Sequence, residues 1–294
     1  MPYDRWTPVK KNSYPYIVFK QYNQEIKRMM MSYESAKKFT YTNLTKNGAD
    51  WPHKANLYLE TKGNDEITIE DWSKVFNKYD NWHRLNCLMA MSSYFETFLA
   101  SIVKLALESD PGTFIGVPHY IDGVQLLKQM RKPFKKQEIE KLIQGCTKGD
   151  WTSRQNSYKR LFGSIPHAFS TAISDLEKIR KLRNNVGHAF GRDIRKSRDY
   201  TISHISLMNP LASKTLYRFH RVIEDCAKDI NEQLMNEHIG NYHPLLIYHN
   251  NRDILNGITN NETVKNLKKM IGKEEQNPYS KEFCTWVVDY YSHL

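Results

Sequence analysis

The chain has 294 residues, a hydrophobic fraction of 40%, a charged fraction of 26% and a formal net charge of +11. These values are typical of a soluble folded protein and argue against both wholesale disorder and a membrane protein. The excess of basic residues favours a polyanionic partner, and nucleic acid is the leading class. Many basic proteins are merely soluble, however, so bulk charge alone does not decide the partner.

No targeting or membrane segment is expected from the sequence. The first residues lack the apolar core of a signal peptide, and the richest apolar run, residues 87–107, is interrupted by Glu96 and Lys104. We therefore expect a cytoplasmic protein. The four cysteines are widely separated and form no CxxC pair, which favours single buried thiols over a zinc site or disulfides. They are Cys87, Cys146, Cys226 and Cys284.

Apolar residues recur at helical spacing in almost every periodic segment, which predicts an all-α fold. Thr68 begins a capping pattern, and the core helix that follows should stop at Asp110-Pro111-Gly112. This stretch is expected to form one long helix or a kinked pair. Asn209-Pro210 resembles an N-cap followed by a proline at the first helical position, so a helix should run from there to Gly240.

Further helices are expected on both sides of this central region. The segment HPLLIYHNN, residues 243–251, is compatible with a short strand or a loop, and Asn277-Pro278 should begin the last helix. We predict an N-terminal helical extension (1–67), a HEPN-like helical bundle (68–240), as argued below, and a mostly helical C-terminal extension (241–294). The other predicted helices cover residues 17–38, 121–130, 136–146, 152–162, 168–190, 261–271 and 278–292.

The segment KIRKLRNNVGHAFGRD, residues 178–193, carries the most informative pattern. Asn184 and His188 are four residues apart and point the same way on a helix. Arg183 lies about 140° from His188, but its side chain is long, and Gly187 leaves the adjacent position without a side chain. The three groups can therefore converge, with His188 moving a proton, Arg183 binding a phosphate and Asn184 orienting a hydroxyl or the imidazole.

Basic residues surround this motif. Between residues 178 and 198 there are eight of them against one acid, Asp193, a local charge of +7. Such a run of basic residues is also found on solvated helix faces that end in an ordinary surface histidine. The sequence alone does not distinguish this interpretation from a functional site. If the segment binds RNA, the residues expected to contact it are Arg180, Arg192, Arg195, Lys196 and Arg198.

The sequence RNNVGH, preceded by SSYFETFL on the first core helix, resembles the R-φ-x-x-x-H signature of the HEPN superfamily. This resemblance implies a helical bundle that homodimerises so that two motifs form a composite site. It also implies a metal-independent endoribonuclease with no cofactor, often acting in toxin or antiviral-defence systems with an antitoxin or other partner protein. In such proteins an acidic residue of the first core helix is often near the site, and Glu96 is the corresponding residue here.

The sequence also allows three other interpretations. His238, His243 and His249 are close in sequence, but their spacing suits ordinary surface or packing histidines better than metal binding. The aromatic side chains Trp151, Tyr158 and Tyr200 lie near basic residues, but core packing is the more common role of such residues. The chain could also be a non-catalytic subunit that binds RNA or a nucleotide, or a helical interaction protein; an intact motif disfavours this alternative.

Overall fold

The computed structural model describes residues 3–60, 66–131, 135–199, 205–255, 259–275 and 279–294. Its regular elements are helices, and strand pairing in these ranges is limited to two isolated bridges, Lys54–Thr68 and Arg192–Met208. The all-α prediction is thus confirmed. None of the described helices combines the length and apolar character needed to cross a membrane.

The chain divides into two compact units, each assembled from segments that are distant in sequence. Unit 1 comprises residues 1–20, 95–173 and 224–294, and unit 2 comprises residues 21–94 and 174–223. The domain boundaries predicted near residues 68 and 240 fall between helices. The boundaries of the two observed units instead fall inside helices, between residues 20 and 21, 94 and 95, 173 and 174, and 223 and 224. Each unit is described separately below.

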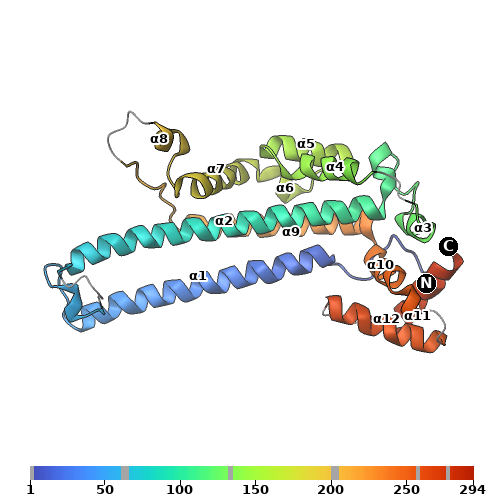
Figure 1. The fold of residues 1–294 in the computed structure, drawn as a ribbon, viewed down its shortest axis with the longest axis horizontal. Coiled ribbons are helices and arrows are strands. Elements are labelled where there is room, and N and C mark those ends of the chain that lie inside the picture. The colour runs from blue at the N-terminus through green and yellow to red at the C-terminus, as the bar shows by residue number, and fades with distance from the viewer. Residues whose placement is uncertain (1–2, 61–65, 132–134, 200–204, 256–258, 276–278) are drawn as a thin grey trace. The chain divides into compact units, whose positions relative to one another are not determined.

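Unit 2 is built around an antiparallel pair of helical segments, residues 21–46 of α1 (Tyr14–Lys46) and residues 69–94 of α2 (Ile69–Ser109) (Figure 1). Ring contacts fix their register within the unit: Tyr22 stacks on Tyr94 at 4.9 Å, and Tyr41 lies 5.8 Å from Trp72. The unit also contains η1 (Ala55–Leu57), α7 (Ile173–Ala189) from its second residue, α8 (Ile194–Arg198) and the start of α9 (Ser213–Leu234).

Unit 1 packs the end of α2 and the end of α9 with shorter helices around an aromatic core. Trp151 is 1% exposed and stacks on Phe95 at a centroid distance of 5.5 Å. The shorter elements are η2 (Pro111–Ile115), α3 (Gly123–Lys128), α4 (Lys136–Thr147), α5 (Trp151–Phe162), α6 (His167–Thr171), the π-helical turn η3 (Met235–Ile239), α10 (Tyr242–Asn250), α11 (Arg252–Leu255), α12 (Asn260–Glu275) and α13 (Lys281–His293).

The signals at both ends of α2 act as predicted. The Thr68 hydroxyl accepts a hydrogen bond from the backbone N–H of Asp71 at 3.1 Å, and the helix ends at Ser109, immediately before Asp110-Pro111. The residues between them form one uninterrupted helix.

The predicted start of α9 at Asn209-Pro210 is wrong, because α9 begins at Ser213. Asn209 is not available as a cap: its backbone N–H donates to the Gly191 carbonyl at 2.7 Å, and its side chain accepts from Asn185. The helix expected from residue 168 is divided at Ala172 into α6 and α7.

The segment HPLLIYHNN is neither strand nor loop, because it forms α10. Pro244 lies in the first turn of this helix, where a missing N–H costs no intrahelical hydrogen bond. Tyr242, Leu245 and Tyr248 recur every three residues and are all buried. Asn277-Pro278, the expected start of the last helix, lies outside the described residues, and α13 is capped by Ser280, whose hydroxyl accepts from the Phe283 N–H.

All four cysteines are buried free thiols, as the sequence predicted. Burial raises the pKa of each of these thiols, to about 12 for Cys146 and Cys226 and to about 11 for Cys284. Since the thiolate is the reactive form, these side chains serve packing rather than chemistry.

Candidate functional site

The motif lies at the exposed end of α7. Leu176 and Ile179, in the first half of the helix, are 0% and 1% exposed. Ile173, Leu182 and Val186 continue the same apolar spacing but are only half-buried. The end of α7 therefore carries its polar side chains at a solvent-accessible surface of unit 2, where a large substrate can reach them.

Arg183 and Asn184 are joined by a direct hydrogen bond. The Arg183 guanidinium donates from Nη1 to the side-chain oxygen of Asn184 at 3.2 Å. His188 lies one turn after Asn184 on the same helix face, and its side chain is exposed. Within the described part of the chain, no hydrogen bond or ion pair is found for the His188 side chain. The guanidinium is thus held toward the face that carries an accessible imidazole.

A second asparagine, Asn185, anchors the end of the helix. Its side-chain N–H donates to the Asn209 side chain at 2.9 Å, and its backbone carbonyl accepts from the Gly191 N–H at 2.9 Å. Asn209 in turn donates its N–H to the Gly191 carbonyl. Sequence reasoning did not assign Asn185 a role; its hydrogen bonds fix where the motif ends.

Gly191 is required by this turn. Phe190 and Gly191 both have positive φ, 52° and 77°, and a Cβ at Gly191 would lie 2.8 Å from a Leu85 methyl group. Gly187 is different, because a Cβ added there would meet no atom within 4 Å. The space beside Gly187 is open, so a small side chain there would not obstruct Arg183. The structure therefore does not require a glycine at this position to make room for the arginine.

The five predicted RNA-binding residues divide into two groups. Arg180 forms a bidentate ion pair with Glu177, and Arg192 donates from Nε to the Ser206 carbonyl at 2.8 Å, so both have structural partners. The remaining three, on α8, are exposed. They are Arg195, Lys196 and Arg198.

Another basic residue, Lys181, belongs to the motif surface and was not singled out from the sequence. Lys181, Asn184 and His188 are spaced i, i+3 and i+7, so they share one face of α7. Lys181 is exposed and, with Lys178 and Asn185, lines an open hollow of about 330 Å³ in unit 2. The helical spacing alone could have revealed this stripe.

Glu96 has a partner of its own in unit 1. Its carboxylate accepts from Arg154 Nη1 at 2.9 Å, and the Arg154 guanidinium lies 4.3 Å from the centre of the Trp151 ring. Because Arg154 is 5% exposed, this ion pair is part of the packing of α2 against α5. The predicted role of Glu96 at the motif stays a prediction.

The three histidines near residue 240 have separate partners and do not form one cluster with each other. His243 stacks on Tyr14 at 5.3 Å, and His249 bonds to the Tyr291 hydroxyl at 2.6 Å. His238 bonds to the Asp110 carboxylate. Trp151 and Tyr158 are buried in the core, as expected, and Tyr200 lies outside the described residues.

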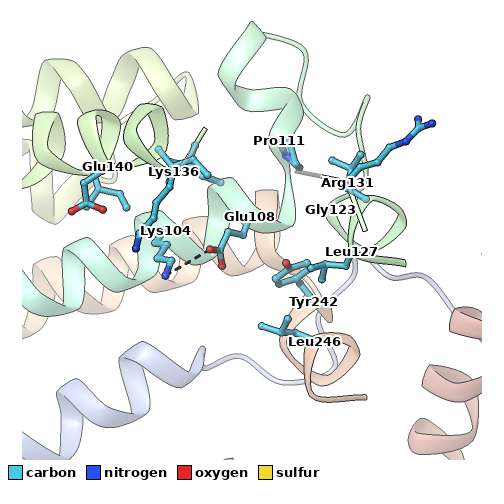
Figure 2. A pocket seen from close by; sticks show the side chains of 14 residues that line it. Lys104, Glu108, Pro111, Gly123, Leu127, Arg131, Lys136, Glu140, Tyr242 and Leu246 are labelled. Atoms are coloured by element: carbon cyan, nitrogen blue, oxygen red, sulfur yellow. Dashed lines mark ion pairs between the residues drawn. The ribbon is translucent and has the colours of Figure 1, made fainter. Parts of the chain in front are cut away.

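Unit 1 also contains a largely apolar cavity of about 350 Å³ between α2, α3, α4 and α10 (Figure 2). Its volume is at the lower end of the range of small-molecule sites. Lys104 and Lys136 reach it from α2 and α4, and Lys104 lies 3.7 Å from Glu108. Burial raises the pKa of the Glu108 carboxyl, although Lys104 opposes the shift.

Comparison with known proteins finds no relative, since no family model, curated protein or solved structure matches the chain. The function proposed below therefore depends on the residues themselves.

Proposed function

We propose that the chain is a metal-independent endoribonuclease of HEPN type, whose active residues are Arg183, Asn184 and His188. The observation that carries this proposal is the 3.2 Å hydrogen bond from Arg183 to Asn184, one helical turn before an exposed histidine. The basic, exposed α8 that follows the motif supports RNA as the substrate. The all-α fold agrees with the bundle that the motif implies.

The chemistry assigned to these residues is transfer of the phosphate within RNA. A base removes the proton from the 2′-hydroxyl, the resulting oxygen attacks the adjacent phosphorus, and the bond from phosphorus to the 5′ oxygen breaks. The products are a 2′,3′-cyclic phosphate and a 5′-hydroxyl, whose proton comes from an acid. His188 can act as base or acid, and Arg183 stabilises the charge that grows on the phosphate oxygens.

A single histidine cannot begin the reaction as both base and acid. A homodimer that brings two copies of the motif together would supply one imidazole for each role, which is the composite site that HEPN resemblance implies. The setting that we propose is a toxin or antiphage defence system, where an antitoxin or other partner protein restrains the enzyme.

The test is cleavage of RNA in EDTA, with circular dichroism of each sample to confirm that the chelator leaves the fold intact. Wild-type protein should produce cyclic phosphate ends, and a single 2′-deoxy substitution at the scissile position should block the cut. Cleavage of the 2′-deoxy substrate would contradict the mechanism, because no 2′-hydroxyl would be present to attack.

A second function, RNA or nucleotide binding without catalysis, is favoured by the cavity in unit 1. Its lining combines apolar side chains with three basic residues and two acidic ones, Glu108 and Glu140, so a small anionic ligand would meet a net positive lining. It predicts salt-sensitive binding without new RNA ends and equal binding by His188→Ala protein. Cyclic phosphate ends that depend on His188 would reject this alternative.

A further inference from the structure

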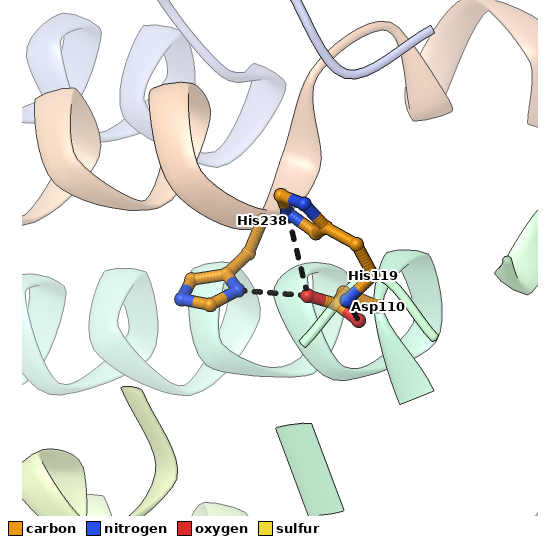
Figure 3. A group of neighbouring side chains, drawn as sticks. All are labelled: Asp110, His119 and His238. Atoms are coloured by element: carbon orange, nitrogen blue, oxygen red, sulfur yellow. Dashed lines mark hydrogen bonds and ion pairs between the residues drawn. The ribbon is translucent and has the colours of Figure 1, made fainter. Parts of the chain in front are cut away.

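A buried aspartate in unit 1 faces two histidines that come from different elements. Asp110 follows α2, His119 follows η2, and His238 lies in the π-helical turn η3 after α9. Asp110 Oδ2 is 2.9 Å from His238 Nδ1 and 3.7 Å from His119 Nε2 (Figure 3). One ligand atom from each residue lies within 4.8 Å of the other two.

The burial of Asp110 is the main argument. Its side chain is 0% exposed, and within the described chain the two imidazoles are the only groups that ion-pair with it. Nearby Arg5 pairs instead with Asp122 at 2.9 Å. A buried carboxylate is costly unless a positive charge and hydrogen bonds compensate it. A divalent cation between the three side chains would supply that charge.

The local backbone presents both histidines to Asp110. His119 has a φ of 63°, which non-glycine residues rarely adopt, and its ring is stacked on Trp6 at 4.1 Å. His238 belongs to a π-helical turn, a feature often found at functional sites. Two uncommon backbone conformations thus meet at one carboxylate.

An unpaired atom of His238 fits the same explanation. Its Nε2 is buried without a hydrogen-bond partner and lies 4.0 Å from the Glu237 carboxylate. If Nδ1 binds a metal, the ring proton is on Nε2, and the Glu237 carboxylate would have to move closer than 4.0 Å to accept it. Histidine ligands commonly donate their second ring N–H to a carboxylate, a carbonyl or water.

We infer that Asp110, His119 and His238 form a binding site for Zn²⁺. Zinc binds imidazole nitrogen and carboxylate oxygen at about 2.0–2.2 Å in a tetrahedron, so ligand atoms end about 3.3 Å apart. The two separations from Asp110 differ from this value by about 0.4 Å each. His119 would exchange its 2.6 Å hydrogen bond to the Glu237 carbonyl for the metal.

The site would have three protein ligands and one position open to water, since the His119 side chain is 44% exposed. Two nitrogen ligands select zinc over Mg²⁺ and Ca²⁺, which prefer oxygen. The site lies in unit 1 and the RNA motif in unit 2, so this inference does not require the motif to use a metal.

The experiment measures bound zinc in the full-length protein after incubation with Zn²⁺ and removal of the excess. Wild-type protein should keep about one equivalent, and its Tm should rise by about 5 °C or more at saturating Zn²⁺ but not with Mg²⁺ or Ca²⁺. His119→Ala should lose the ion and the shift while remaining folded, because His119 lies at the surface. His119→Cys, which keeps a zinc ligand, should retain binding.

His243→Ala is the matched control, since His243 packs on Tyr14 and is not part of the cluster. It should bind zinc as the wild type does. Wild-type protein without bound zinc and without a Tm shift would overturn the inference. So would a His119→Ala protein with undiminished zinc, or an equal Tm shift with Ca²⁺.

Discussion

Arg183 donates a hydrogen bond from its guanidinium to the side-chain oxygen of Asn184, its neighbour on α7. Adjacent residues on a helix point about 100° apart, so this contact draws the arginine around the helix toward the face of Asn184 and His188. A guanidinium carries five N–H donors in a planar fork, a geometry that suits binding of a phosphate at two points.

Replacement of Arg183 by lysine tests this geometry. The positive charge is kept, but the planar set of donors that can bind a phosphate at two points is lost. We expect the cleavage rate to fall on the order of 10²-fold with little change in RNA affinity. Single-turnover cleavage and filter binding measure the two effects. An unchanged cleavage rate would show that charge alone suffices and would contradict the assigned role.

Gly187→Ala separates stability from activity at the motif. Because the Cβ position is open, alanine should stabilise α7 by about 0.5–1 kcal/mol, as seen at other helix interiors. If RNA occupies the space beside Gly187, cleavage should nevertheless decrease. Urea unfolding and cleavage assays are made on the same sample. Gly191→Ala is the contrasting variant and should be destabilised, since φ is positive and Leu85 is too close.

The exposed basic residues of α8 should set the salt dependence of RNA binding. Replacing Arg195, Lys196 and Arg198 by alanine should weaken binding for all RNA sequences and reduce the slope of log affinity against log salt by about 2, or 0.7 per phosphate contact. Arg180→Ala is the comparison, because Arg180 is paired with Glu177 and should change the slope less. An unchanged slope in the triple variant would place RNA elsewhere.

Asp80 should make unit 2 sensitive to acid. Burial alone would raise the pKa of this carboxyl, but hydrogen bonds and charge from Lys37 and Arg84 outweigh it and hold the pKa below its ordinary value. A lowered folded pKa means that the ion pairs stabilise the protein above about pH 4 and lose this effect as the pH falls further.

Asp80→Asn should therefore lower the free energy of unfolding by about 1–3 kcal/mol at pH 6, and the difference from wild type should shrink near pH 3. Urea unfolding at the two pH values measures it. A difference that is the same at both values would mean that the ionised carboxylate is not the stabilising group. Glu25→Gln, at an exposed position of α1 in the same unit, is the control.

Helix positions could be predicted from the sequence where local signals determine them. The Thr68 cap and Asp110-Pro111 mark the ends of α2, and apolar spacing reveals the helical fold. The helix start predicted at Asn209-Pro210 is wrong because Asn209 forms hydrogen bonds with Gly191 and Asn185. These contacts exist only in the folded turn and leave no local signal in the sequence. The strand or loop predicted for HPLLIYHNN is wrong because most of its residues are apolar and show no clear period in the sequence. The segment is helical in the folded chain, where its apolar side chains are buried in unit 1.

The two candidate sites also differ in how far the sequence alone could reveal them. Arg183, Asn184 and His188 lie within six residues of one helix, so spacing alone indicates that they can converge. Asp110 and His238 are 128 residues apart, and they meet only because the ends of α2 and α9 pack together in unit 1. No sequence pattern connects them with His119.

The most direct test of the central claim is the single-turnover rate of RNA cleavage in EDTA for wild-type, His188→Ala and His243→Ala proteins. The proposed mechanism predicts that His188→Ala is slower by about 10²–10⁴-fold, with the same circular dichroism spectrum, and that His243→Ala cleaves as the wild type does. Cleavage by His188→Ala at the wild-type rate would contradict it.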